Sequence, residues 1–278
     1  MRIALACLLL CGPCAAHAQS PSLLTRSEQA VIDFGFATQL GSGVYTMSGR
    51  TLQVYKLPFG YDFDHAPDAR VRVSLTLPVT LGFIDFEPID VVETGLPQSL
   101  DSLSFVPGLM LDIALASRWR LQPFVEAGIA RDRDSDHDQN IYAVGLRSLY
   151  DFGSGSTDWQ LYDELLHSAV EQRSLDRSDD FTRLRLGVSA RRPFDVAGEG
   201  RRADFLAYGF ADLFPNAPDS PLNGGDDGDR GAPQLELGVT FGSTEPLRWW
   251  GIALPRIGLG YRFGEDLSVY RLVFGTPF

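Results

Sequence analysis

Residues 70–83, RVRVSLTLPVTLGF, decide the fold class. The odd positions from Val71 to Phe83 are all apolar, whereas the even positions hold arginine, serine, threonine, proline or glycine. Because successive side chains of a strand point to opposite faces, this alternation predicts a β-strand with one apolar face. The seven apolar positions on that face exceed what a soluble strand of about five or six residues would show. They suit a tilted strand that crosses a membrane.

The same alternation recurs in three later segments of the chain. Residues 182–191 place leucine, valine and alanine on one face and arginine, glycine and serine on the other. Residues 234–242 and 256–264 repeat the pattern, again with glycine and charged residues on the non-apolar face. In a membrane barrel the apolar face meets lipid and the other face points into the lumen.

A pass along the chain predicts twelve strands. Their approximate ranges are 30–39, 50–57, 70–84, 102–115, 119–130, 140–152, 156–168, 180–191, 203–213, 233–242, 250–264 and 267–278. Bacterial single-chain barrels have an even number of strands, with short turns on the periplasmic side and longer loops outside. The fold class predicted here is therefore all-β: a single transmembrane up-and-down antiparallel β-barrel of twelve strands, formed after removal of a signal peptide.

One segment fits two structures. Between Thr157 and Arg173, leucines, a tyrosine, an alanine and a valine recur at helical spacing, and Thr157 with Gln160 resembles a helix capping box. A helix here would leave eleven strands, which breaks the expected parity. The parity favours a strand, and the helix stays open as the alternative.

The first residues have the features of a secretory signal peptide. Arg2 gives a positive start, residues 3–10 are apolar, and Ala16-His17-Ala18 offers a cleavage site. We expect residues 1–18 to be the signal peptide, 19–29 a short polar lead, and 30–278 one outer-membrane barrel domain. The cysteines all lie within the first fourteen residues, so the exported barrel is expected to contain no disulfide. Lipoprotein processing at one of these cysteines is the alternative.

Charge and hydropathy exclude other classes. The net charge of −12 argues against nucleic-acid binding, which needs a concentrated basic surface. No later stretch reaches the eighteen continuous apolar residues that would suggest a membrane-spanning helix. The expected location is the bacterial outer membrane, reached by export, with outer-membrane lipid as the surrounding partner.

The chain ends in LSVYRLVFGTPF, residues 267–278. Tyr270, Leu272, Phe274 and Phe278 resemble the C-terminal signal by which barrel-assembly machinery recognises its substrates. Together with the twelve strands, this end resembles the solitary outer-membrane autotransporter-like β-barrel family, which has a translocator-like barrel without a passenger. The resemblance implies a barrel of that architecture; secretion of a passenger is not carried over.

Charged residues on the non-apolar faces are the candidate functional residues. Lipid-facing arginine near the membrane midplane costs about 2–4 kcal/mol, so these side chains are expected to point into the lumen. They either line a narrow pore that favours anions or pair with carboxylates and fill the lumen. The lumen-lining candidates are Arg70, Arg72, Arg183, Arg185, Arg191, Glu236, Arg256, Arg262 and Arg271.

No catalytic, metal or cofactor site is expected. The aspartates of residues 132–138 alternate like calcium ligands, but the glycine and glutamate that an EF-hand requires are absent. His167 and Ser168 are adjacent, so on a strand they face opposite sides and cannot form a dyad. We therefore expect a non-enzymatic structural barrel or narrow pore whose solute is unknown. A membrane-embedded lipid-modifying hydrolase and a soluble periplasmic β-barrel binding protein remain the alternatives.

Overall fold

The computed structural model describes most of the chain downstream of residue 37. The described residues are 38–39, 41–47, 50–66, 68–84, 102–132, 138–153, 155–172, 177–195, 202–216, 233–243, 248–249, 252–253, 256–264, 268–275 and 277. The expected signal peptide and polar lead lie outside them. Among the described residues, no helix is long and apolar enough to cross a lipid bilayer.

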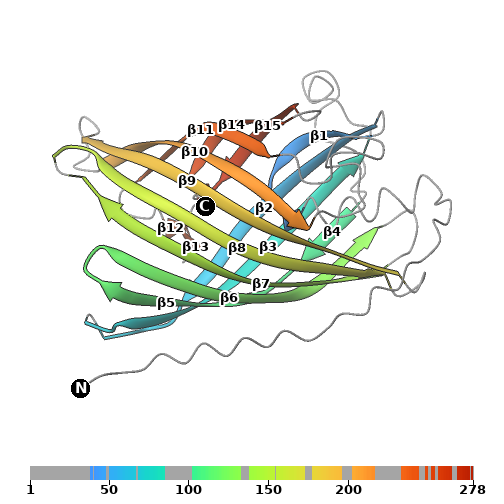
Figure 1. Cartoon of the computed structure of the whole chain (residues 1–278), viewed down its shortest axis with the longest axis horizontal. Helices are drawn as coiled ribbons and strands as arrows, with labels where there is room; N and C mark the ends of the chain where they lie inside the picture. Colours follow the sequence, from blue (N-terminus) through green and yellow to red (C-terminus); the bar gives the residue numbers. More distant parts are fainter. Residues whose placement is uncertain are drawn as a thin grey trace.

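One large antiparallel sheet makes up the described structure (Figure 1). Its strands are β1 (Gly43–Met47), β2 (Arg50–Asp62), β3 (Val71–Ile84), β4 (Ser102–Phe105), β5 (Gly108–Ala116), β6 (Trp119–Asp132), β7 (Asp138–Phe152), β8 (Asp158–Gln172), β9 (Arg177–Asp195), β10 (Arg202–Asn216), β11 (Gln234–Ser243), β14 (Ile257–Phe263) and β15 (Ser268–Phe274). A separate two-residue pair joins β12 (Arg248–Trp249) to β13 (Ile252–Ala253).

The sheet has twelve wall positions, as predicted. Strands β4 and β5 both pair with β3 and β6, because residues Val106 and Pro107 interrupt what is otherwise one strand. Every other strand of this sheet pairs with the next one along the chain, except that β11 pairs with β14 across the separate β12–β13 pair. The last strand, β15, lies beside β1, where the Arg271 guanidinium donates a hydrogen bond to the Ser42 carbonyl at 2.7 Å. The sheet thus curls until its two ends meet.

Two strand predictions are wrong in part. Of the expected first strand, residues 30–39, only Thr38 and Gln39 are among the described residues; they are helical, and β1 begins at Gly43. The segment 250–264 is not one strand; it contains the short β13 and then β14. Arg256 lies just before β14, where the chain turns back towards β11.

The segment with helical spacing is strand β8. It pairs with β7 and β9 along its full length, from Asp158 to Gln172. Its burial alternates residue by residue, so the helix alternative is wrong. The turn before it contains Gly153 and Gly155, whose φ angles are +108° and +109°. Glycine adopts this left-handed backbone without a Cβ clash, which allows the tight connection between β7 and β8.

The two faces of the sheet differ in chemistry. Outward positions are mostly leucine, valine, isoleucine and aromatic residues, such as Leu259 at 65% exposure. Inward positions carry polar and charged groups together with buried aromatic rings such as Phe124, Tyr162 and Phe181. The most enclosed side chains therefore lie in the lumen, and the polar face is the buried one.

Close packing within the lumen makes Gly145 on β7 sensitive to substitution. A Cβ there would overlap the Phe124 ring and approach the Leu165 carbonyl at 2.9 Å. We expect Gly145→Ala to lower the free energy of unfolding by about 1–3 kcal/mol, because the buried ring must shift. Urea unfolding monitored by tryptophan fluorescence measures this. Ala127→Val, on the exposed face of β6, is the control and should change stability little; equal values for both variants would contradict the packing account.

Candidate functional site

Charged side chains and tyrosine hydroxyls from β7 to β15 form a connected network in the lumen. We call it the lumen network, and its members are Arg147, Tyr162, Glu164, Arg183, Arg185, Tyr208, Asp212, Glu236, Arg262 and Arg271. All of them except Arg147 are buried. The alternation of each strand points these side chains inwards, and the pairing of neighbouring strands brings them to similar heights.

Glu164 on β8 is the centre of the first half of the network. Its two carboxylate oxygens accept from Arg147 on β7 at 2.7 Å and from Arg183 on β9 at 2.5 Å. The Tyr162 hydroxyl donates to the same carboxylate at 2.6 Å. The Arg147 guanidinium lies over the Phe124 ring, 4.3 Å from its centroid, which adds a cation–π contact.

Glu236 on β11 is the centre of the second half. Its carboxylate accepts from Arg262 on β14 at 2.9 Å, and it also pairs with Arg271 on β15. The Tyr208 hydroxyl on β10 donates to it at 2.9 Å. Each glutamate therefore has two guanidinium groups and one tyrosine hydroxyl as partners, on different sets of strands.

Asp212 on β10 joins the two halves. Arg185 donates two hydrogen bonds to the Asp212 carboxylate, at 2.6 and 2.8 Å. This bidentate geometry is favoured between guanidinium and carboxylate groups. Arg183 approaches Asp212 to 3.9 Å from the first half, and Arg262 approaches to 3.4 Å from the second. The Arg185 guanidinium also lies 3.8 Å from the centroid of the Phe210 ring.

The network contains more guanidinium groups than carboxylates, and backbone carbonyls help to balance them. Arg183 donates to the Gln39 carbonyl at 3.3 Å, and Arg271 donates to the Ser42 carbonyl at 2.7 Å. Thr38 and Gln39 are helical, and both are buried. The two arginines thus fix the segment 38–42 against the wall of the lumen.

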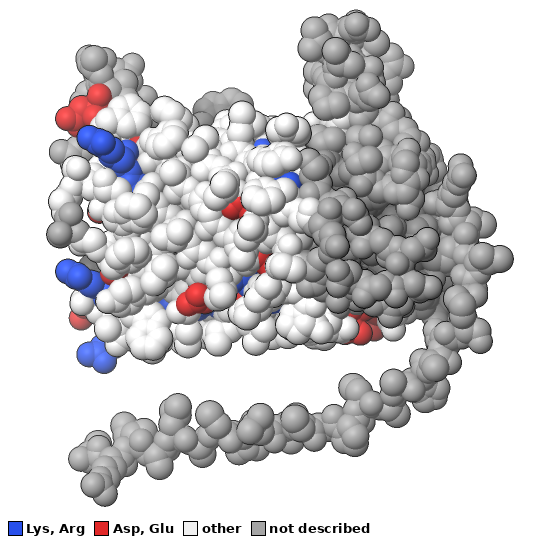
Figure 2. Space-filling model, turned by 45° about the horizontal axis from the view of Figure 1, so that its top comes forward, with Lys and Arg blue, Asp and Glu red and all other residues white. Residues whose placement is uncertain are grey.

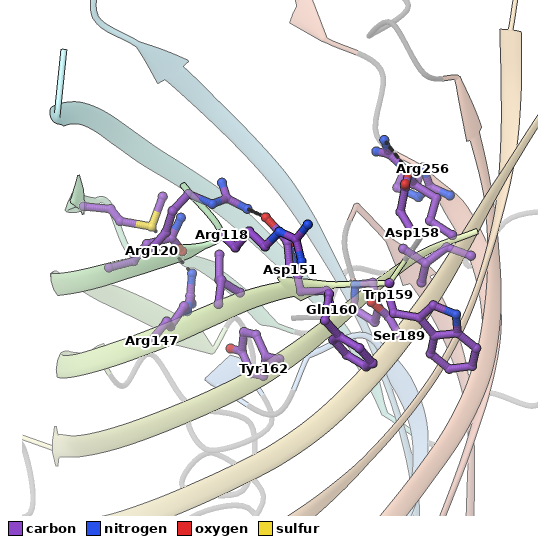
Figure 3. Close-up of a pocket in the computed structure, with 18 residues that line it drawn as sticks. Arg118, Arg120, Arg147, Asp151, Asp158, Trp159, Gln160, Tyr162, Ser189 and Arg256 are labelled. Atoms are coloured by element: carbon purple, nitrogen blue, oxygen red, sulfur yellow. Dashed lines mark hydrogen bonds and ion pairs between the residues drawn. The ribbon is translucent and has the colours of Figure 1, made fainter. Parts of the chain in front are cut away.

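A cavity of about 720 Å³ lies at the end of the barrel where the β5–β6 and β7–β8 turns are. Figure 3 shows arginines from several strands at its edge, with Arg147 and Tyr162 of the lumen network lining it as well. Most of these cations already have partners. Arg120 approaches Asp112 at 3.5 Å and Asp151 at 3.8 Å. The cavity is therefore lined by ion pairs.

The predicted lumen residues fall into three groups. Arg183, Arg185, Glu236, Arg262 and Arg271 meet in the lumen network. Arg191 and Arg256 lie in the wall of the cavity, where Arg191 approaches Asp158 at 3.6 Å and Arg256 pairs with Asp204. Arg70 and Arg72 are exposed at the start of β3 and take no part in the network.

The sequence interpretation missed several members of the network. Glu164 and Tyr162 lie on β8, whose helical spacing hid their alternation with Leu161, Asp163 and Leu165. Asp212 was within a predicted strand, and its alternation with Tyr208 and other inward residues of β10 is visible in the sequence. The signal for these residues was the same period of two that identified the arginines.

The described residues of the C-terminal assembly signal lie on the outer face. Tyr270 is 73% exposed, and Leu272 and Phe274 share its face. Phe278 lies outside the described residues. This arrangement leaves the aromatic face of β15 on the surface of the barrel.

The adjacent His167 and Ser168 do lie on opposite faces. His167 is exposed, and its Nδ1 is 3.1 Å from the Thr182 hydroxyl. Ser168 is buried and donates to the Tyr142 carbonyl at 3.1 Å. The described part of the chain contains no group of three histidine, cysteine, aspartate or glutamate residues placed to hold a metal ion, and most of the acidic loop 132–138 lies outside it.

Comparison with solved structures agrees with this architecture. The chain is similar to the β domain of the Bordetella autotransporter BrkA, with a TM-score of 0.53 and 10% identity over 84% of this chain and 95% of that one. The chain has the fold of an autotransporter β domain. It is also similar to LpxR from Salmonella typhimurium, with a TM-score of 0.45 and 11% identity over 82% of this chain and 88% of that one. No protein-family model and no curated protein matches the sequence.

Loss of a network carboxylate should destabilise the barrel. Glu236→Gln leaves Arg262 and Arg271 buried with one charged partner fewer. We expect the free energy of unfolding to fall by about 3–5 kcal/mol, the range for breaking a buried ion pair. Urea titration of the folded protein measures the change. Glu171→Gln, on the exposed face near the end of β8, serves as the control; a loss as small as that of the control would contradict the role given to Glu236.

Proposed function

We propose that this protein is a non-enzymatic outer-membrane β-barrel whose lumen is closed at mid-height, so that it serves as a structural barrel and not as an open pore. The observation that carries the proposal is the pair of links from the wall to the segment 38–42. Arg183 pairs with Glu164 and donates a hydrogen bond to the Gln39 carbonyl. Arg271 pairs with Glu236 and donates a hydrogen bond to the Ser42 carbonyl. Together these links connect opposite stretches of the sheet through the lumen.

The surface chemistry supports a membrane location. The outer face exposes large apolar side chains such as Leu237 at 61% and Leu259 at 65%. In water these side chains would form an extended hydrophobic patch, which soluble proteins avoid. Figure 2 shows a face that is mostly uncharged, with most of its basic atoms towards one end. A soluble binding barrel would have the opposite arrangement, with apolar residues inside.

Aromatic residues near the turns support an orientation. Trp119, Tyr150 and Trp159 are exposed beside the β5–β6 and β7–β8 turns. Tryptophan and tyrosine favour the membrane interface, and outer-membrane barrels have their short turns in the periplasm. We therefore place these turns on the periplasmic side. The exposed face of β15, with Tyr270, Leu272 and Phe274, is where we expect the barrel-assembly machinery to bind.

Energetics support closure of the lumen. Opening the lumen would separate buried guanidinium groups from their partners, and each uncompensated buried charge costs several kcal/mol. Arg262, Asp212 and Glu236 have no exposed side-chain surface. An anion pathway needs arginines in contact with water, and these arginines are instead paired. The arginine-rich lumen is thus better explained as a filled interior than as an anion-selective pore.

The proposal that the protein is not an enzyme rests on the geometry of His167 and Ser168. A hydrolase needs a nucleophile within hydrogen-bond reach of a base, usually about 2.6–3.2 Å. His167 contacts the Thr182 hydroxyl on the exposed face, whereas Ser168 is in the lumen. The Thr182 hydroxyl that His167 contacts lies on the outer face of the wall. This arrangement supports a structural role for His167, in a side-chain contact between β8 and β9.

Conductance measurements test the closed lumen. In planar lipid bilayers the folded protein should show no single-channel steps at moderate voltage. The double variant Arg183→Ala/Arg271→Ala removes both donors to the segment 38–42, while Arg147 and Arg262 still pair with the two glutamates. This variant should be less stable but should still migrate as a folded barrel, because each glutamate keeps one guanidinium partner. It should show discrete openings, because the segment is released from the wall.

Arg191→Ala is the matched control, since Arg191 faces the lumen near the turns and contacts neither carbonyl. It should stay closed like the parent protein. Heat-modifiable migration on a denaturing gel confirms that each variant is a folded barrel. Steady open channels in the parent protein would overturn the proposal, and the anion selectivity of those channels would then favour the narrow pore.

A further inference from the structure

One carboxylate interrupts the apolar outer face of the barrel. Asp163 is the sixth residue of the fifteen-residue strand β8, and its side chain is exposed on the outside. On the described strands, the other outward-facing charged residues lie within four residues of a strand end, and they are Arg131, Asp138, Glu171, Asp180 and Arg192. Asp163 alone among the described outward-facing residues places a formal charge in the middle of a strand.

Its position corresponds to the interior of the membrane. Asp163 is four residues beyond Trp159, which is exposed at the end of the strand near the turn. Four residues extend about 13 Å along a strand, or about 10 Å in depth at a tilt of about 40°. The apolar band of such barrels is about 25 Å tall. Asp163 therefore lies close to the midplane if Trp159 marks the interface.

The surroundings of Asp163 are apolar. Leu161 and Leu165 flank it on the same face of β8, and Leu186 lies directly opposite on β9. On the β7 side it is opposite Ser148, whose hydroxyl already accepts a hydrogen bond from the Trp119 indole at 3.1 Å. Within the described part of the chain, no ion pair or hydrogen bond reaches the Asp163 carboxylate.

The neighbouring inward carboxylate shows the contrast. Glu164 has two arginines and a tyrosine hydroxyl as partners. A carboxylate in hydrocarbon without a partner is costly, and ionisable residues at membrane depth are usually paired. Asp163 has the cost of a charged group at this depth without any of the contacts that offset it for Glu164. A partner outside this chain would supply them.

We propose that the outer face of β8 around Asp163 is a lateral contact site for a different membrane-embedded protein, which presents an arginine or lysine at the depth of Asp163. The inference rests on the membrane location proposed above. The three exposed leucines around the carboxylate give the contact an apolar rim, which excludes water and strengthens an ion pair at its centre.

Two other occupants fit less well. Copies of this chain related by an axis along the membrane normal would meet at equal depth, and the described outer faces offer no arginine or lysine in mid-strand. Lipid headgroups carry cations, but they lie at the interface and not near the midplane. Charge complementarity at this depth therefore points to a second protein.

Synthetic transmembrane peptides test the chemistry of the site. The full chain would be folded into phosphatidylcholine vesicles with dye-labelled leucine-rich helices that carry arginine, leucine or glutamate at their centre. Energy transfer from tryptophan to the dye measures association. The arginine peptide should bind about tenfold more tightly than the leucine peptide, a difference of about 1.4 kcal/mol.

Variants at one position then assign the effect. Asp163→Asn should abolish the preference for the arginine peptide, and Asp163→Lys should transfer it to the glutamate peptide. Leu259→Asn, which puts the same amide on the exposed face of β14, is the matched control and should leave the preference unchanged. Equal binding of the arginine and leucine peptides to the parent protein, or a preference that survives in Asp163→Asn, would overturn the inference.

Two further readouts separate the possible failures. If the parent protein shows no heat-modifiable migration after reconstitution, the membrane location itself is overturned, and this site with it. In native outer membranes, a photo-crosslinking residue at Leu165 reports what covers the face. An adduct at twice the mass of the chain would identify a second copy and overturn the proposal of a different protein. An adduct of another mass that disappears in Asp163→Asn would support the proposal.

Discussion

The buried pairing of guanidinium and carboxylate groups across the lumen is the constraint on which the rest of the structure depends. A closed sheet with an apolar outer face must turn its polar positions inwards, where few water molecules can solvate them. The charges there need direct partners. Glu164, Asp212 and Glu236 supply these partners from three different strands, and the arginines between them connect β7 to β15. The seam between β15 and β1 is held by one of the same arginines, Arg271.

The excess of positive charge explains why the segment 38–42 lies where it does. Three carboxylates cannot neutralise all the arginines of the lumen network, and the remaining donors need neutral acceptors. Backbone carbonyl oxygens are hydrogen-bond acceptors with a partial negative charge, and they suit this role. The Gln39 and Ser42 carbonyls accept from Arg183 and Arg271. The position of this segment therefore follows from the charge balance of the wall, and the wall in turn gains a contact across its seam.

Local alternation was sufficient to predict the class of fold, the number of wall positions and the inward direction of most arginines. It worked because side-chain direction in a strand is set by the backbone, independently of distant contacts. It was insufficient for β8, where Leu166 and Val170 face the lumen and give the segment its helical spacing. The partners of each arginine could not be predicted either, because Glu164 and Arg183 come together only through the register between β8 and β9. Strand β1 was not predicted at Gly43–Met47, and Thr38 and Gln39, which were expected in a strand, are helical, with the Gln39 carbonyl accepting from Arg183.

The two acidic neighbours on β8 show how the same residue type takes different roles on the two faces. Glu164 is enclosed by its own chain, so its charge is used within the fold. Asp163, one residue earlier, is exposed on the outer face with leucines around it, and the proposed membrane location would place it in hydrocarbon. A carboxylate is tolerated there only if its charge is lost or if a donor from outside approaches it. A cationic partner would offset this cost and add specificity, because a wrong neighbour would leave the charge unpaired.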